Sequence, residues 1–189
     1  MDLLLGILSA FGLSASAGLN AYIPLLVISL LGRFTNWITL AEPWNTLESW
    51  WVIGALVVLS GIEFFADKFP AVNHVNDLIQ TLVRPAAGAI AFASSADVIT
   101  EASPAFSLIL GLLIAGSVHV TKSVVVRPAV TATTGGAGNI PVSILEDIIS
   151  TVLSILAVIV PVLVAAFIII FTAWVIWWLW RRANRAAQH

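Results

Sequence analysis

The sequence predicts an all-α fold: a polytopic transmembrane helical bundle of about six spans, with broken or re-entrant segments, forming a single domain over residues 1–189. Apolar residues make up 60% of the chain and charged residues only 10%, a composition far outside the range of soluble domains. Residues 3–32 and 148–180 contain no charged residue, and about 20 apolar residues suffice to cross a bilayer. Shorter uncharged runs recur between these two stretches, so several crossings are expected.

The orientation of the crossings follows from the distribution of Lys and Arg, which are enriched in cytoplasmic loops. The C-terminal "RRANRAAQH" is basic, whereas the loop with Glu42 and Glu48 and the loop with Asp97 and Glu101 are acidic. We therefore expect both termini in the cytoplasm and the two acidic loops outside. The predicted crossings are 3–32, 51–68, 72–96, 104–121, 123–141 and 143–180.

The first crossing begins with "LLLGILSAFGL" followed by "SASAG", which is similar to a signal-peptide core with a small-residue cleavage site. No Lys or Arg precedes the apolar run, so we expect a transmembrane helix instead. Ser9, Gly12, Ser16 and Asn20 share one side of this helix, which is predicted to face inward.

The third crossing carries a polar stripe. At 100° per residue, Asn73, Asp77, Gln80 and Arg84 fall within an arc of about 60°. We expect this stripe to face protein or water, and the apolar residues on the other sides, such as Leu82, to face lipid or apolar packing.

Two Arg–Pro pairs, Arg84–Pro85 and Arg127–Pro128, each predict the start of a half-helix, because Pro is favoured at the first helical position. Free N–H groups at such a start, beside a guanidinium, suit a carboxylate or phosphate. One prediction is therefore that both arginines contribute to a central anion-binding region. The competing prediction is a pair of structural ion pairs, Arg84 with Asp77 and Arg127 with Asp147.

The fifth and sixth crossings are less regular in sequence. "VVVRPAVTATTGGAGNIP" is rich in Gly, Thr and Pro, and irregular backbone at membrane depth is tolerated only inside protein or along a water-filled cavity, so we expect it in the interior. Residues 143–180 would span about 57 Å as one straight helix. We expect Pro161 to kink this helix, with two helices around Pro161 as the alternative. Its polar stripe consists of Ser143, Asp147, Ser150, Thr151 and Ser154.

Short sequence echoes raise the possibility of an internal repeat. "AGLNAYIPLLVISLL" is similar to "GAGNIPVSILEDIIS", and "TLVRPAAGA" to "VVVRPAVTA". Six crossings divide into two halves of three, which predicts a possible 3+3 inverted repeat. The order of the echoes along the chain, however, is not that of a simple tandem duplication.

Several function classes are disfavoured. The chain has no cysteine, and neither His74 nor His119 belongs to a metal-binding spacing, so we expect no metal and no cofactor. There is no nucleophile elbow, Walker loop or dinucleotide fingerprint, which argues against an enzyme. A net charge of −2 without a basic patch argues against nucleic-acid binding.

Ionisable side chains inside the membrane are the strongest functional candidates, because a central Arg, Lys or Asp costs about 2.5–3.5 kcal/mol on insertion scales. Such residues usually pair with one another or line a pathway. The expected substrate-binding residues are Arg84, Arg127, Asn20, Asn139 and Asn73, and the expected proton- or ion-coupling residues are Asp67, His74, Asp77 and Asp147.

The stretch "ADKFPAVNHVNDLIQTLVRPAAGA", with the upstream "SAGLNAYIPLL" and a downstream Gly-rich Asn–Pro segment, resembles the bacterial integral-membrane family called domain of unknown function 4126. The resemblance implies a single membrane domain, and we expect it in the bacterial cytoplasmic (inner) membrane. It carries over no substrate and no catalytic residue. The most specific positions are Asp67, Lys68, Pro70, Asn73, His74, Asp77, Arg84 and Pro85.

These observations favour a transporter, channel or flippase-like protein that moves a small anionic solute or a lipid headgroup through a polar centre. The alternative is a non-transporting scaffold or partner subunit with structural intramembrane ion pairs. An intramembrane enzyme acting on lipid has the least support. Expected partners are membrane lipid, a small anionic substrate and a second copy of the chain in a homo-oligomer.

Overall fold

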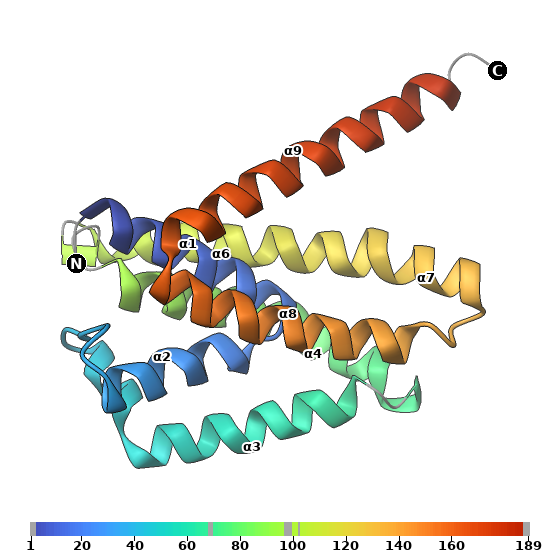
Figure 1. Cartoon of the computed structure of the whole chain (residues 1–189). Helices are drawn as coiled ribbons and strands as arrows, with labels where there is room; N and C mark the ends of the chain where they lie inside the picture. Colours follow the sequence, from blue (N-terminus) through green and yellow to red (C-terminus); the bar gives the residue numbers. More distant parts are fainter. Residues whose placement is uncertain (1–2, 68–69, 97–99, 102, 187–189) are drawn as a thin grey trace.

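The described part of the chain is entirely helical. The computed structural model describes residues 3–67, 70–96, 100–101 and 103–186, and no strand occurs among them (Figure 1). Most helices pack side by side, with α1 against α4, α6 and α8, and the start of α1 and the end of α9 lie at opposite ends of the molecule (Figure 1). The predicted all-α helical bundle is therefore confirmed.

The expected first crossing, 3–32, is wrong, because it is divided into α1 (Leu3–Leu19) and α2 (Tyr22–Phe34). α1 runs from one end of the bundle to its middle and α2 returns to the same end (Figure 1). Pro24 has no N–H to donate to the Asn20 carbonyl, which interrupts the helical ladder there. Asn20 Oδ1 instead accepts hydrogen bonds from the N–H groups of Tyr22 and Ile23, both at 3.1 Å, and caps α2.

The next elements are a short 3₁₀ turn, η1 (Trp44–Glu48), and two long helices, α3 (Trp50–Ala66) and α4 (Pro70–Ser95). α4 runs without interruption through Pro85, so the half-helix expected to start there does not form. α4 packs closely against α6: a Cβ added at Gly88 would collide with Ala115 and approach the Gly111 carbonyl, both on α6. Close packing of this kind tolerates one missing hydrogen bond within the helix.

Residues 104–134 form one helical stretch of 31 residues instead of two crossings. α6 (Pro104–Thr121) continues through the π-helical turn η2 (Lys122–Val126) into α7 (Arg127–Thr134). The wider π-turn shifts the hydrogen-bond register just before Pro128, which cannot donate, so the helix continues instead of restarting. The expected irregular, interior segment is therefore wrong: α7 is helical and largely exposed, and only the Gly135–Gly136 turn, with φ of 62° and 92°, breaks it.

The last segment contains two helices, α8 (Asn139–Ile159) and α9 (Pro161–Ala186). A single kinked helix over 143–180 is thus wrong, and the alternative of two helices is correct. Val160, at φ −138° and ψ 64°, leaves the helical region, as expected for a residue that precedes proline. α9 turns back from α8 and leans away from the bundle (Figure 1).

α1 is the central helix and packs against α4, α6, α8 and α9. Its small and hydroxyl residues allow close contact: Ser9 donates to the Ala157 carbonyl, and Ser16 to the Ser150 carbonyl, each at 2.8 Å. On the α6 side, Ser14 donates to the Gly111 carbonyl, also at 2.8 Å. The polar stripe of α8 is turned inward to meet α1: Ser143, Asp147, Ser150 and Ser154 are all buried.

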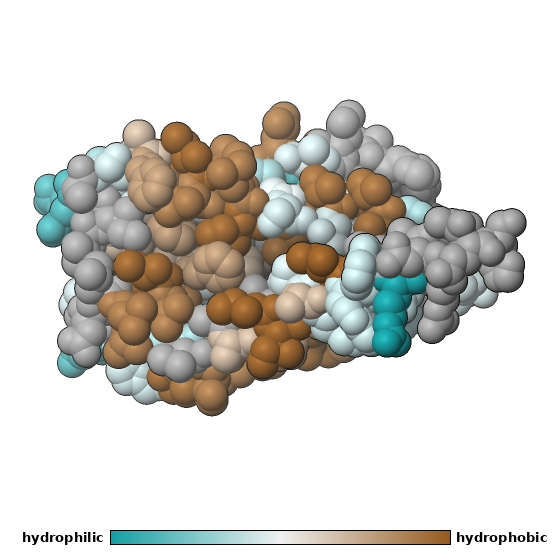
Figure 2. Space-filling model, turned by 90° about the horizontal axis from the view of Figure 1, so that it is seen from above, coloured by the Kyte–Doolittle hydropathy of each residue, from teal (hydrophilic) through white to brown (hydrophobic). Residues whose placement is uncertain are grey.

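Large apolar side chains cover much of the surface, as Figure 2 shows for one face in brown. Exposed examples include Val58 on α3, Leu113 on α6 and Phe167 on α9. An apolar surface of this extent is unusual for a soluble monomer. By length and composition, Pro104–Thr134 and Asn139–Ile159 suffice to cross a membrane. Together these features indicate membrane association.

Candidate functional site

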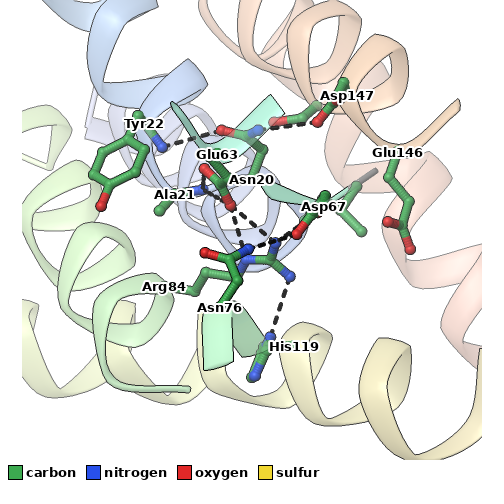
Figure 3. Close-up of polar contacts among 12 residues, drawn as sticks. Asn20, Ala21, Tyr22, Glu63, Asp67, Asn76, Arg84, His119, Glu146 and Asp147 are labelled. Carbon is green, nitrogen blue, oxygen red and sulfur yellow. Dashed lines mark hydrogen bonds and ion pairs between the residues drawn. The ribbon is translucent and has the colours of Figure 1, made fainter. Parts of the chain in front are cut away.

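Six charged side chains meet where α1 ends in the middle of the bundle, and we call them the charge cluster. They come from α3 and the residue that follows it, from α4, from the continuous helix α6–η2–α7 and from α8, so elements far apart in sequence converge here (Figure 3). The members are Glu63, Asp67, Arg84, Lys122, Arg127 and Glu146.

Arg84 is the innermost member, with a side chain that is 0% exposed. Its Nη2 and Nε lie 2.9 and 3.2 Å from Glu63 Oε1. Its Nη1 lies 3.3 Å from His119 Nδ1. A guanidinium can only donate, so Nδ1 accepts and the neutral imidazole carries its proton on Nε2, which lies 3.3 Å from Thr81 Oγ1. The α4 stripe is therefore turned inward at Arg84.

Asp67 is the shared carboxylate of the charge cluster. Three cations surround its Oδ2: Arg127 Nη2 at 3.3 Å, Arg84 Nη2 at 3.4 Å and Lys122 Nζ at 3.7 Å. Its Oδ1 accepts a 2.7 Å hydrogen bond from Asn76 Nδ2. The two arginines of the Arg–Pro pairs therefore do meet, but around a carboxylate of the protein.

Lys122 connects the charge cluster to the end of α1. Its Nζ lies 2.7 Å from Glu146 Oε2 and donates to the Leu19 carbonyl at 3.1 Å. Leu19 is the last residue of α1, where carbonyls lack partners within the helix and the helix dipole is negative. The ammonium group thus caps α1.

Glu63 connects the charge cluster to the start of α2. Its Oε2 accepts a hydrogen bond from the Ala21 N–H at 3.1 Å, at the positive end of the α2 dipole. Asn20 completes the junction by donating from Nδ2 to Asp147 Oδ1 at 3.0 Å. Both ends of the break between α1 and α2 are therefore held by groups of the appropriate charge, and Figure 3 shows the contacts at the α2 end.

Exposure changes systematically across the charge cluster. The side chains of Arg84, Glu63, Asp67 and Lys122 are 0 to 3% exposed, whereas those of Glu146 and Arg127 are 10% and 12% exposed. The outer two residues belong to α8 and α7. The charge cluster therefore lies nearest to the surface on the side formed by these two helices.

The structure brings together five of the predicted site residues and separates one. Asn139 is the first residue of α8, and its Nδ2 donates to Thr131 Oγ1 on α7 at 3.0 Å, away from the charge cluster. The side chains of Asn73, His74 and Asp77 lie outside the described residues. Those that meet in or beside the charge cluster are Asn20, Asp67, Arg84, Arg127 and Asp147.

Only the expected pair of Arg127 with Asp147 can be compared with the structure, because the side chain of Asp77, the expected partner of Arg84, lies outside the described residues. Arg84 contacts Glu63 and Asp67, and Arg127 contacts Asp67 and Glu146, at up to 4.0 Å. Asp147, the expected partner of Arg127, is instead the acceptor for Asn20. The expectation for Arg127 differs from its described contacts because the partners come from helices whose relative rotation depends on packing.

Sequence reasoning missed three members of the charge cluster: Glu63, Lys122 and Glu146. A signal was present for two of them. Glu63 is an isolated carboxylate in an otherwise uncharged helix, and Glu146 lies three residues after Ser143 and four before Ser150, on the polar stripe of α8. Among the described residues, no group of three His, Asp or Glu side chains is arranged to hold a metal ion.

Comparison with known proteins gives a family and nothing closer. No curated protein and no solved structure matches the chain. The family described as "Domain of unknown function (DUF4126)" matches residues 7–182, which is nearly the whole chain. The chain therefore belongs to the family of the domain of unknown function 4126.

Proposed function

We propose that the protein is a multi-pass membrane transporter, channel or flippase-like protein that moves a small anionic solute or a lipid headgroup past the charge cluster. The observation that carries this proposal is the convergence of three cations and three carboxylates, nearly all buried, at a break between two helices. In known transporters, interrupted helices present their ends to the solute and the coupling ion at the membrane midplane.

Energetics favour function over pure stabilisation. Removing ionised groups from water is expensive, and buried ion pairs can often be replaced by apolar residues of similar volume without loss of stability. A membrane interior increases this cost, so six charged side chains in one cluster are difficult to explain by packing alone. Their gradient of exposure towards Arg127 and Glu146 supports entry of a polar solute from that side.

The proposed topology differs from the expected one at the N-terminus. A hairpin of α1 and α2 that returns to its own side leaves crossings by α3, α4, α6–α7, α8 and α9, which is consistent with the start of α1 and the end of α9 at opposite ends of the molecule (Figure 1). We place the C-terminus in the cytoplasm of a bacterial inner membrane and the N-terminus outside, beside the acidic loops. A homo-oligomer also remains a proposal. The 3+3 inverted repeat is not proposed, because five crossings do not divide into two halves of three.

A second candidate function, a non-transporting scaffold, is supported by one observation. Every member of the charge cluster lies within 4.0 Å of an opposite charge, so internal pairing is sufficient to hold these groups in place. In this case the charges stabilise the bundle and no solute passes.

Flux measurements on purified protein in liposomes distinguish the two candidates. Uptake of radiolabelled gluconate or phosphate, both of which cross lipid slowly, is compared with glucose, and scrambling of fluorescent phosphatidylglycerol with that of phosphatidylcholine. If the protein is a transporter, its uptake or scrambling rate exceeds that of empty liposomes. The Arg84→Lys variant should lose this rate, because Lys lacks the planar guanidinium fork. Arg33→Lys is the matched control, since Arg33 contacts the Glu48 carbonyl far from the charge cluster. Wild-type protein that moves none of these probes would refute transport of an anion.

A further inference from the structure

The arrangement around Asp67 is that of an occupied anion site. Its Oδ2 is within 3.3 to 3.7 Å of Arg127, Arg84 and Lys122, and its Oδ1 is held by the amide of Asn76. Three cations around one oxygen, with a neutral donor on the other, is the set of partners expected for a bound oxyanion.

Charge balance shows what this position requires. Glu63, Asp67 and Glu146 contribute three negative charges and Arg84, Lys122 and Arg127 three positive charges, so the charge cluster is neutral. Asp67 is the one carboxylate among the described residues that all three cations approach, so its removal would take a negative charge away from all three. Loss of a buried counter-charge is strongly unfavourable, so the position calls for a negative charge.

We infer that the carboxylate of Asp67 occupies the position of the transported anion and competes with it for the three cations. The substrate class is a singly charged oxyanion that presents two neighbouring oxygens, either a carboxylate or a phosphodiester. This inference rests on the proposed function and deepens it by naming the substrate. Asp67 follows the last residue of α3, so its side chain can withdraw without breaking that helix.

The geometry also gives the order in which a solute meets these groups. Arg127, the most exposed member of the charge cluster, contacts an entering anion first, and Arg84, which is 0% exposed, contacts it last. Lys122, which is 3% exposed, is held by Glu146 and the Leu19 carbonyl. An anion that takes the Asp67 position therefore puts its own oxygen where Asp67 Oδ2 was, and the three cations stay in place.

The test is chemical rescue of the full-length protein purified in detergent. Asp67→Ala removes the carboxylate and leaves space for one formate ion, whereas Asp67→Asn removes the same charge and leaves no space. Formate at about ten times its Kd is expected to raise the Tm of Asp67→Ala by roughly 3–6 °C and to leave Asp67→Asn unchanged. Formamide, which is neutral and has nearly the same shape, and sodium chloride at equal ionic strength are the controls. Asp67→Ser, prepared in parallel, provides the same opening if the alanine variant does not fold.

A lipid source of the anion is tested in the same variants reconstituted in nanodiscs. Stabilisation by phosphatidylglycerol over phosphatidylcholine, without an effect of formate, assigns the site to a phosphodiester headgroup, whereas rescue by formate assigns it to a free carboxylate. Folded Asp67→Ala and Asp67→Ser that respond to neither overturn the inference. If the wild-type protein transports an anion but formate does not rescue the variants, the proposal of transport stands and the proposed role of Asp67 is wrong. If formate rescues the variants but the wild-type protein shows no flux, the anion site stands and transport is wrong.

Discussion

At the residue scale, Glu63 holds two parts of the molecule together. Its Oε1 accepts from Arg84 Nη2 at 2.9 Å and its Oε2 from the Ala21 N–H at 3.1 Å, with a side chain only 1% exposed. The same carboxylate therefore neutralises the most buried cation and caps the start of α2. A neutral amide in its place can still accept hydrogen bonds but cannot balance the guanidinium.

Glu63→Gln is expected to destabilise the protein by about 3 kcal/mol, within the usual range for removing one partner of a buried ion pair. Glu146→Gln is the matched comparison and should have a smaller effect, because that side chain is 10% exposed. The double variant Glu63→Gln, Arg84→Gln is expected to recover part of the loss, since it leaves no unbalanced charge. Unfolding in denaturant in the same detergent measures all three. Equal losses for Glu63→Gln and Glu146→Gln would show that burial does not determine the strength of these pairs.

At the element scale, the break between α1 and α2 depends on Asn20, which has two different partners. Its Oδ1 caps α2 and its Nδ2 donates to Asp147 Oδ1 at 3.0 Å. An amide can do both at once because it carries an acceptor and a donor. A carboxylate can only do the first.

Substitutions at Asn20 separate these two roles. Asn20→Ala removes the cap and is expected to cost about 1 kcal/mol. Asn20→Asp keeps an excellent capping oxygen but places it against the Asp147 carboxylate, so we expect it to be at least as destabilising as the alanine variant near neutral pH. Thermal unfolding compares them with the wild type. Wild-type stability in Asn20→Asp would show that the contact with Asp147 does not involve a charged carboxylate.

The close crossing of α4 and α6 predicts a second effect at the element scale. A Cβ at Gly111 would lie 2.7 Å from the Ala89 Cα, a backbone atom, so Gly111→Ala forces the helices apart and should cost roughly 1–3 kcal/mol. Gly54 on α3 has nothing within 4 Å of an added Cβ and is the matched control. Gly54→Ala should leave the Tm unchanged or raise it, because Ala favours helix over Gly. Equal Tm values for the two variants would contradict the tight crossing.

At the scale of the whole molecule, the hairpin of α1 and α2 determines, in the proposed topology, on which side of the membrane the N-terminus lies. A single first crossing puts residues 4 and 45 on opposite sides, whereas the hairpin puts them on the same side. The absence of cysteine from the chain makes this distinction directly testable.

Single cysteines at Leu4, Asn45 and Ala186 provide the test in intact cells. An impermeant thiol reagent is expected to label positions 4 and 45 but not 186, because the acidic loops are placed outside and the basic C-terminal segment inside. All three positions should react after permeabilisation, which shows that each is accessible. Labelling of position 45 without position 4 would support a single first crossing. Labelling of position 186 in intact cells would show that the orientation is the opposite of the proposed one.

Local composition by itself determined the class of this protein and the positions of its polar stripes. A run of apolar residues specifies a helix and its need for an apolar environment without reference to the rest of the chain. The inward faces of α1 and α8, with Ser16 and Ser154, could be predicted in this way, and so could the burial of Arg84 on α4. The choice of Asp67 and Arg127 as candidates also followed from sequence, through the cost of placing a charge at membrane depth.

Only the tertiary structure decided which charges meet and where the helices break. Asp67 and Arg127 are 60 residues apart, and Lys122 and Leu19 are 103 residues apart, so no local pattern specifies their contact. Three proline-containing stretches illustrate the same limit: α4 continues through Pro85, α7 follows a π-turn at Pro128, and a new helix starts at Pro161. A proline removes one hydrogen-bond donor in every case, but whether the helix continues depends on the neighbours packed against it.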